Sequence, residues 1–172
     1  MTAAPGRSPR AFDTPREVVR SLLGVWVRSP TLARVYLGGT LEPSLRERVM
    51  VAVSQVNACA GCTAVHERWA LRAGVSDEEL DAIGLGNLAR LDPRSRAAVV
   101  YAAGLAEAGF GRPPDPDLVA LARTHLTADE LRAVEAVARM MAFANLSANT
   151  VARGLSRSAP IPGDRLPQRE SY

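Results

Sequence analysis

Apolar residues return every three or four positions along most of the chain, which is the spacing of one face of an α-helix. The clearest such stripe starts in residues 43–47, and the opposite face of the same helix carries two further apolar residues, Val51 and Ala58. A helix that is apolar on both faces is a buried one, so we expect this helix at the centre of the fold. The stripe consists of Leu45, Val49, Ala52, Val53 and Val56.

No stretch of useful length alternates between apolar and polar residues, so the sequence predicts an all-α helical bundle. Several helix starts are marked by Ser or Thr followed three residues later by Glu, the pattern of a capping box. Asp-Pro pairs at 92–93 and 115–116 and a Ser-Pro pair at 29–30 open further helices. The last helix is expected to continue, with a bend, to Arg153. The boxes begin at Thr14, Ser44, Ser76 and Thr127.

Two helices are expected to bury large side chains along one face. In the helix that follows Thr14, that face carries Val18, Leu22, Val25 and Trp26. In residues 59–73, a helical wheel places Cys59, Cys62, His66 and Trp69 on the inward side. We therefore expect Trp69 in the core, whereas His125, beside a loop, should be exposed and uninvolved.

The chain has 172 residues, of which 47% are hydrophobic and 23% are charged, values that fit one globular domain. Residues 1–12 are rich in Pro, Arg and small side chains and are expected to be disordered. Residues 156–172 are polar and basic and should form a flexible tail. The helical domain is accordingly predicted to span residues 13–155.

Charge is dispersed rather than clustered. All 21 basic residues are Arg, they are spread along the chain among 18 acids, and the net charge is +3, so no nucleic-acid groove is expected. The N-terminus lacks the apolar stretch of a signal peptide, and no apolar run is long enough to span a membrane. We therefore expect a cytoplasmic protein, in which a close cysteine pair is more often redox-active or metal-binding than structural.

Reactive side chains concentrate in residues 47–66. Cys59 and Cys62 are three residues apart, and His66 follows four residues after Cys62, one helical turn away. The start of a helix and a neighbouring imidazole both favour a thiolate, the reactive form of cysteine. A zinc site is the alternative, but a fourth ligand is missing, since the other histidine is the distant His125 and there is no third cysteine. The residues therefore favour redox chemistry over a metal.

Glu47 lies twelve residues before Cys59, on the helix that leads into the cysteine pair. A turn near Asn57 could bring its carboxylate beside His66, where it would orient the ring and stabilise its charged form. The alternative role for Glu47 is the last residue of the capping box that begins at Ser44.

These residues resemble a known family. The order Glu47, Cys59-Ala60-Gly61-Cys62, His66, followed by 73–76 and the acidic cluster 77–79, is similar to the alkylhydroperoxidase D and carboxymuconolactone decarboxylase superfamily, most of all to its peroxidase-related branch. The resemblance is specific for residues 42–85 and elsewhere is one of helix pattern.

The resemblance implies an all-helical domain that assembles as trimers or hexamers. It also implies that Cys62 attacks a hydroperoxide, that Cys59 resolves it to a Cys59–Cys62 disulfide, and that Glu47 and His66 form the proton relay. No metal or bound cofactor is implied. An external dithiol would reduce the disulfide, and the best-known member uses a lipoyl-carrying protein.

One position departs from that best-known member, which has a second histidine just before its attacking cysteine where this chain has Gly61. The sequence thus predicts a thiol peroxidase or disulfide oxidoreductase with a shorter relay. Two alternatives stay open: a lactone decarboxylase that uses Glu47 and His66 without thiol turnover, and a non-enzymatic oligomer whose cysteine pair only senses oxidation.

Overall fold

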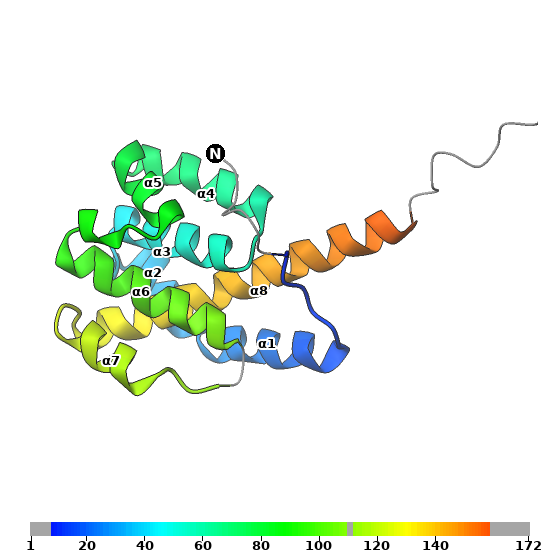
Figure 1. Ribbon diagram of the computed structural model, residues 1–172. Helices are drawn as coiled ribbons and strands as arrows, with labels where there is room; N and C mark the ends of the chain where they lie inside the picture. The colour runs from blue at the N-terminus through cyan, green and yellow to red at the C-terminus, as the bar shows by residue number, and fades with distance from the viewer. Residues whose placement is uncertain (1–7, 110–111, 159–172) are drawn as a thin grey trace, which may run out of the picture.

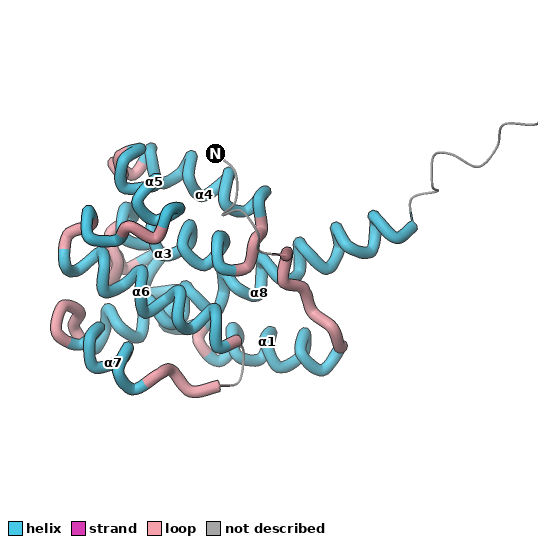
Figure 2. The backbone as a smooth tube through the Cα atoms, in the orientation of Figure 1, coloured by secondary structure: helices cyan, strands magenta, loops and turns pink. Residues whose placement is uncertain are grey.

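The computed structural model describes residues 8–109 and 112–158, which form eight α-helices and one short 3₁₀ helix with no strand among them. The all-α prediction is therefore confirmed, and Figure 2 shows these helices joined by loops. In chain order they are α1 (Pro15–Val27), α2 (Ser29–Leu37), α3 (Pro43–Val56), α4 (Ala60–Arg72), α5 (Asp77–Leu85), η1 (Leu88–Arg90), α6 (Pro93–Ala108), α7 (Pro116–Arg123) and α8 (Ala128–Ser158).

Helix α3 is the centre of the bundle, as its two apolar faces predict. It packs against α4, α5, α6 and α8, and Figure 1 shows it between α4 and α5 on one side and α6 and α8 on the other. Val49 and Val53 belong to the larger core, which α3 shares with α6 and α8. Val51 and Ala52 belong to a second, smaller core beneath α5. One helix therefore joins both apolar cores of the domain.

Three of the four capping boxes have the predicted effect on the helix starts. The hydroxyl groups of Thr14, Ser76 and Thr127 each accept the N–H of the glutamate three residues later. The box at Ser44 is wrong, because α3 begins one residue earlier, at Pro43, and Ser44 lies inside its first turn. A proline at the first helical position has a preset φ and starts the helix without a side-chain cap. Glu47 is consequently available for other contacts.

Residues 1–12 and 156–172 were expected to be disordered or flexible, but the parts of them that the structure describes are ordered. Residues 8–12 pack onto the bundle: Phe12 is buried against Phe143, and the Arg10 N–H donates to the Asn57 carbonyl. At the other end α8 continues to Ser158, beyond the predicted boundary at 155. The remaining parts of both predictions, residues 1–7 and 159–172, lie outside the described residues.

Two predicted inward faces are only partly buried in the single chain: Val18 and Val25 of α1 are half-buried, and Cys59 is buried at the start of α4. On α1, Leu22 and Trp26 lie on the surface, with Trp26 71% exposed, although the wheel predicted them inside. Trp69 on α4 is 50% exposed, so its predicted core position is also wrong. His125 is exposed, as expected. Among residues 8–109 and 112–158, no helix combines the length and the hydropathy needed to cross a bilayer.

Candidate functional site

The turn between α3 and α4 presents the cysteine pair. Ala58 has φ of 50°, a left-handed conformation that is uncommon for a residue with a side chain. The turn is held by backbone hydrogen bonds, since the Asn57 N–H donates to the Val53 carbonyl and the Cys59 N–H to the Ser54 carbonyl, at 3.1 and 3.0 Å. Cys59 thereby becomes the N-cap of α4, and its carbonyl accepts the Thr63 N–H.

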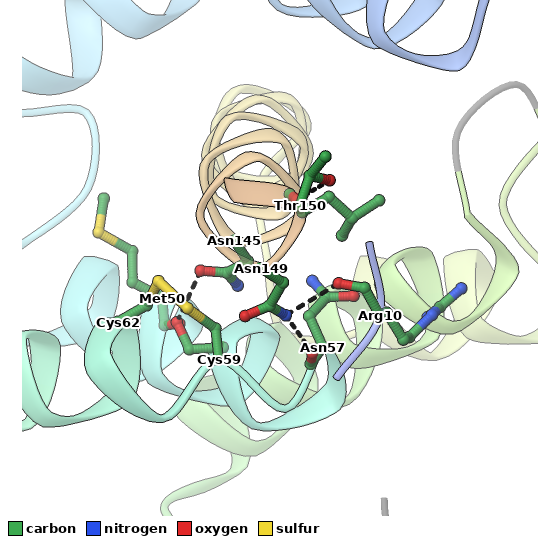
Figure 3. Close-up of a disulfide and its surroundings, with 10 residues drawn as sticks. Arg10, Met50, Asn57, Cys59, Cys62, Asn145, Asn149 and Thr150 are labelled. Carbon is green, nitrogen blue, oxygen red and sulfur yellow. Dashed lines mark hydrogen bonds between the residues drawn. A yellow bond between two sulfur atoms is a disulfide. The ribbon is translucent and has the colours of Figure 1, made fainter. Parts of the chain in front are cut away.

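Cys59 and Cys62 form a disulfide within the first turn of α4, with Cα atoms 5.3 Å apart (Figure 3). The two cysteines differ in access, because Cys59 is 4% exposed and Cys62 is only half-buried. The start of α4 also supplies backbone N–H groups and the positive end of the helix dipole. The sulfur environment thus favours a thiolate, and Cys62 is the cysteine that a small molecule can reach more easily.

The buried stripe of α4 is offset from the predicted one. The residues that pack deepest on this helix and its cap are Cys59, Thr63 and Ala70. Cys62 and His66 lie at the edge of that stripe, half-buried. This placement keeps the thiol and the imidazole against the protein while leaving each of them partly accessible.

Glu47 and His66 are in direct contact, as predicted. His66 Nδ1 lies 2.8 Å from Glu47 Oε2, and the exposed fractions of the two side chains are 13% and 3%. Because a carboxylate only accepts hydrogen bonds, Nδ1 carries the proton in this contact and Nε2 is the nitrogen left for other partners. The Trp69 ring meets the imidazole edge-on at 5.4 Å between ring centroids, which further limits the ring's rotation.

The other carboxylate oxygen of Glu47 is 3.3 Å from Arg46 Nε. The Arg46 guanidinium in turn lies over the Tyr36 ring, 4.8 Å from its centroid. Burial raises the pKa of the Tyr36 hydroxyl, the nearby Arg46 lowers it and Glu47 raises it, with a net increase. Tyr36 is therefore protonated at neutral pH. Both oxygens of the buried carboxylate thus have a positively charged or hydrogen-bonding partner, as a buried acid requires.

Two polar residues behind the disulfide were not assigned to the site from the sequence. Ser54 Oγ donates to the Met50 carbonyl at 2.8 Å and lies 3.4 Å from Asn145 Oδ1. Figure 3 shows Asn145 of α8 beside the disulfide, and its Nδ2 has no hydrogen-bond partner among the described residues. The available signal was the spacing of Asn145 and Asn149, four residues apart on the buried face of a long apolar helix.

Residues 8–109 and 112–158 contain no group of three or more His, Cys, Asp or Glu side chains that could hold a metal ion. The disulfide itself is the redox-capable group of the site.

Residues 29–104 match the sequence model of the carboxymuconolactone decarboxylase family. This segment belongs to that family. It extends from the start of α2 into α6 and contains Glu47, Cys59, Cys62 and His66, so the resemblance inferred from these residues is confirmed. A search of curated proteins finds no match to the chain.

The first prediction concerns the state of the cysteine pair. We expect an intramolecular Cys59–Cys62 disulfide that opens and closes reversibly, because both sulfurs lie in one helical turn. Without reduction, iodoacetamide should add to neither cysteine; after dithiothreitol it should add to both, as read by intact mass. Elemental analysis should find no stoichiometric metal. Zinc at one equivalent per chain, lost together with activity on chelation, would contradict this.

Proposed function

We propose that this member of the carboxymuconolactone decarboxylase family is a thiol-dependent peroxidase, a disulfide oxidoreductase that reduces hydroperoxides through Cys59 and Cys62. The observation that supports this most is the Glu47–His66 contact on the same helix pair as the disulfide, with His66 one turn after Cys62. An acid, an imidazole and a thiol in this order form a proton relay beside a redox centre.

The access of the two cysteines supports their assignment. Cys62, half-buried and one turn from His66, is the attacking thiol in this proposal. Cys59, 4% exposed and already within bonding distance of Cys62, is the resolving thiol. A hydroperoxide needs to reach only one sulfur, whereas the second thiol reacts with a group that is held beside it.

The proposed cycle has three steps. The Cys62 thiolate attacks the distal oxygen of a hydroperoxide, the O–O bond breaks, and the alcohol leaves with a proton supplied by His66 as Cys62 becomes a sulfenic acid. The Cys59 thiol then attacks that sulfur, and the disulfide forms with release of water. An external dithiol, such as a lipoyl group, exchanges with the disulfide, which restores both thiols and oxidises the dithiol.

Two other functions fit the same residues in part. A lactone decarboxylase would use Glu47 and His66 as acid–base groups and would not need the sulfurs. A redox-sensing oligomer would form the disulfide without steady turnover. The cysteine pair in bonding distance at a helix start is the observation that favours peroxidase chemistry over the first, and partial exposure of Cys62 favours turnover over the second.

The second prediction is the direct test of this function. The purified chain should consume an alkyl hydroperoxide continuously in the presence of a dithiol, assayed against a panel of reductants that includes dihydrolipoamide. Cys62→Ser should abolish consumption. Cys59→Ser should permit one attack per chain and then stop, because the sulfenic acid is not resolved. Full activity in Cys62→Ser would reject the thiol mechanism, no peroxide consumption by the wild type would contradict the proposed function, and a single turnover in the wild type would favour the sensor.

The third prediction concerns the relay. An imidazolium near a thiol favours the thiolate, so His66→Ala should move the pH midpoint of Cys62 alkylation upward by about one unit. The measurement uses reduced protein with Cys59 changed to Ser, so that only one thiol reacts. Glu47→Gln should give a smaller shift in the same direction, since the ring is loosened but not removed.

His125→Ala is the matched control for the relay, because His125 is the other histidine of the chain and is exposed. It should leave the midpoint unchanged. An unchanged midpoint in His66→Ala as well would reject the relay and leave the start of α4 as the main activating influence.

We also propose that the chain forms a homotrimer, or a hexamer built from two trimers. Helix α1 lies in the subunit contact. The support is the apolar surface of α1 and α2 in the single chain, where Trp26 and Leu37 are 71% and 89% exposed. Apolar patches of this kind on helices typically mark protein contacts. Leu22, Leu23 and Val27 extend the same surface along α1.

The fourth prediction tests this assembly. Light scattering at micromolar concentration should give three or six copies for the wild type and a smaller species for Trp26→Glu. Leu85→Glu is the control, since Leu85 is equally apolar and exposed but ends α5, on the side of the bundle away from α1 (Figure 1). A monomeric wild type would contradict the proposal, as would equal dissociation of both variants.

A further inference from the structure

Residues 8–13, the first that the structure describes, line part of a cavity of about 650 Å³. This cavity is distinct from the thiol site. The segment is tied down at several points: Arg10 Nη1 donates to the Ala106 carbonyl at 2.6 Å, and the Phe12 N–H donates to Thr150 Oγ1 at 2.9 Å. None of the described residues that line the cavity is a cysteine or a histidine. Its volume is in the range of small-molecule sites.

One wall of this cavity is apolar. It is formed by the end of α6 and by the middle of α8, which contribute Leu105, Ala138, Ala142 and Leu146. The small alanine side chains leave room beside α8 that larger residues would fill. An apolar body of a ligand would therefore be accommodated along this helix.

Among the described residues that line the cavity, the charged side chains are predominantly positive, with five arginines and three acids. Two of the arginines are engaged by acids, since Arg139 pairs with Glu135 at 2.8 Å and Arg153 pairs with Asp13 at 3.2 Å. Arg20 and Arg112 make no ion pair or hydrogen bond within residues 8–109 and 112–158. Two guanidinium groups are thus available to an anion at this cavity.

Asn57 is the second, independent indication of a ligand. It lines the cavity, it is 1% exposed, and neither its Nδ2 nor its Oδ1 has a hydrogen-bond partner among the described residues. Its backbone carbonyl, in contrast, accepts from both Arg10 N–H and Asn149 Nδ2, which fixes the residue in place (Figure 3). A buried amide with an unused donor and an unused acceptor is costly unless a ligand group or water pairs with it.

We propose that this cavity binds an amphiphilic organic carboxylate that also carries a hydroxyl group. The carboxylate pairs with Arg20 and Arg112, the apolar chain lies along Ala138 and Ala142, and the hydroxyl both donates to and accepts from the Asn57 amide. Each part of the ligand matches a different property of the lining. The carboxylate matches the unpaired positive charge, the apolar chain matches the apolar wall, and the hydroxyl matches the unpaired amide.

The fifth prediction tests this binding by calorimetry on the full-length, disulfide-bonded chain, with 10-hydroxydecanoate as the probe. The acid should bind, its methyl ester should bind about tenfold more weakly because the charge is lost, and decanoate should bind about fivefold more weakly because the amide stays unpaired. Equal binding of the acid and the ester, or no binding of the acid at millimolar concentration, would overturn the proposal.

Two variants assign the contacts to residues. Arg20→Gln should weaken binding of 10-hydroxydecanoate several-fold, whereas Arg16→Gln, one turn earlier on the exposed surface of α1 and outside this cavity, should not. Asn57→Leu should remove the advantage of 10-hydroxydecanoate over decanoate, with folding verified by circular dichroism. Equal effects of the two arginine variants, or a retained advantage in folded Asn57→Leu, would refute the assignment. The assay contains no peroxide or reductant, so its outcome is independent of the thiol chemistry.

Discussion

A carboxylate buried at the start of the central helix constrains the arrangement around it. The Glu47 side chain is 3% exposed, and an isolated ion in such a position would cost several kcal/mol. Its two oxygens are satisfied by His66 and Arg46, one from the neighbouring helix and one from its own. The pairing with His66 therefore ties the start of α3 to α4 and holds the imidazole in one orientation. The acid stabilises the same helix pairing that the proposed chemistry uses.

The opposite end of α3 is held by a different set of polar contacts. The Asn57 carbonyl receives hydrogen bonds from Arg10 at the chain's beginning and from Asn149 on the last long helix. Ser54 and Asn145 add a second contact between α3 and α8, one turn away. Segments that are far apart in the sequence thus converge on the turn that leads into Cys59. The cysteine pair is supported by the whole bundle, although its own sequence motif is short.

Local patterns in the sequence predicted the helices, the central position of α3 and the Glu47–His66 contact, because each depends on spacing within a few turns or on an adjacent pair of helices. Sequence patterns gave wrong predictions where the burial of a side chain or the start of a helix depends on packing partners or adjacent residues. A helical wheel orients Trp69 but does not show that α4 packs mainly against α3, which covers only a narrow stripe of it. The box at Ser44 failed because Pro43 competes for the same helix start. The packing of residues 8–12 depends on α8, which lies more than a hundred residues later.

The position of the disulfide has a consequence for how oxidation could be communicated. Cys59 caps α4, Cys62 lies in its first turn, and their Cα atoms are 5.3 Å apart, a separation that a helix provides with or without the bond. Opening the bridge therefore requires side-chain rotation and no rearrangement of the backbone. The oxidised and reduced proteins should therefore have the same surface shape for a macromolecular partner to bind. A binding partner that distinguishes the oxidised from the reduced protein would have to form a covalent bond with a sulfur atom. Recognition of the protein's shape alone would not separate the two states.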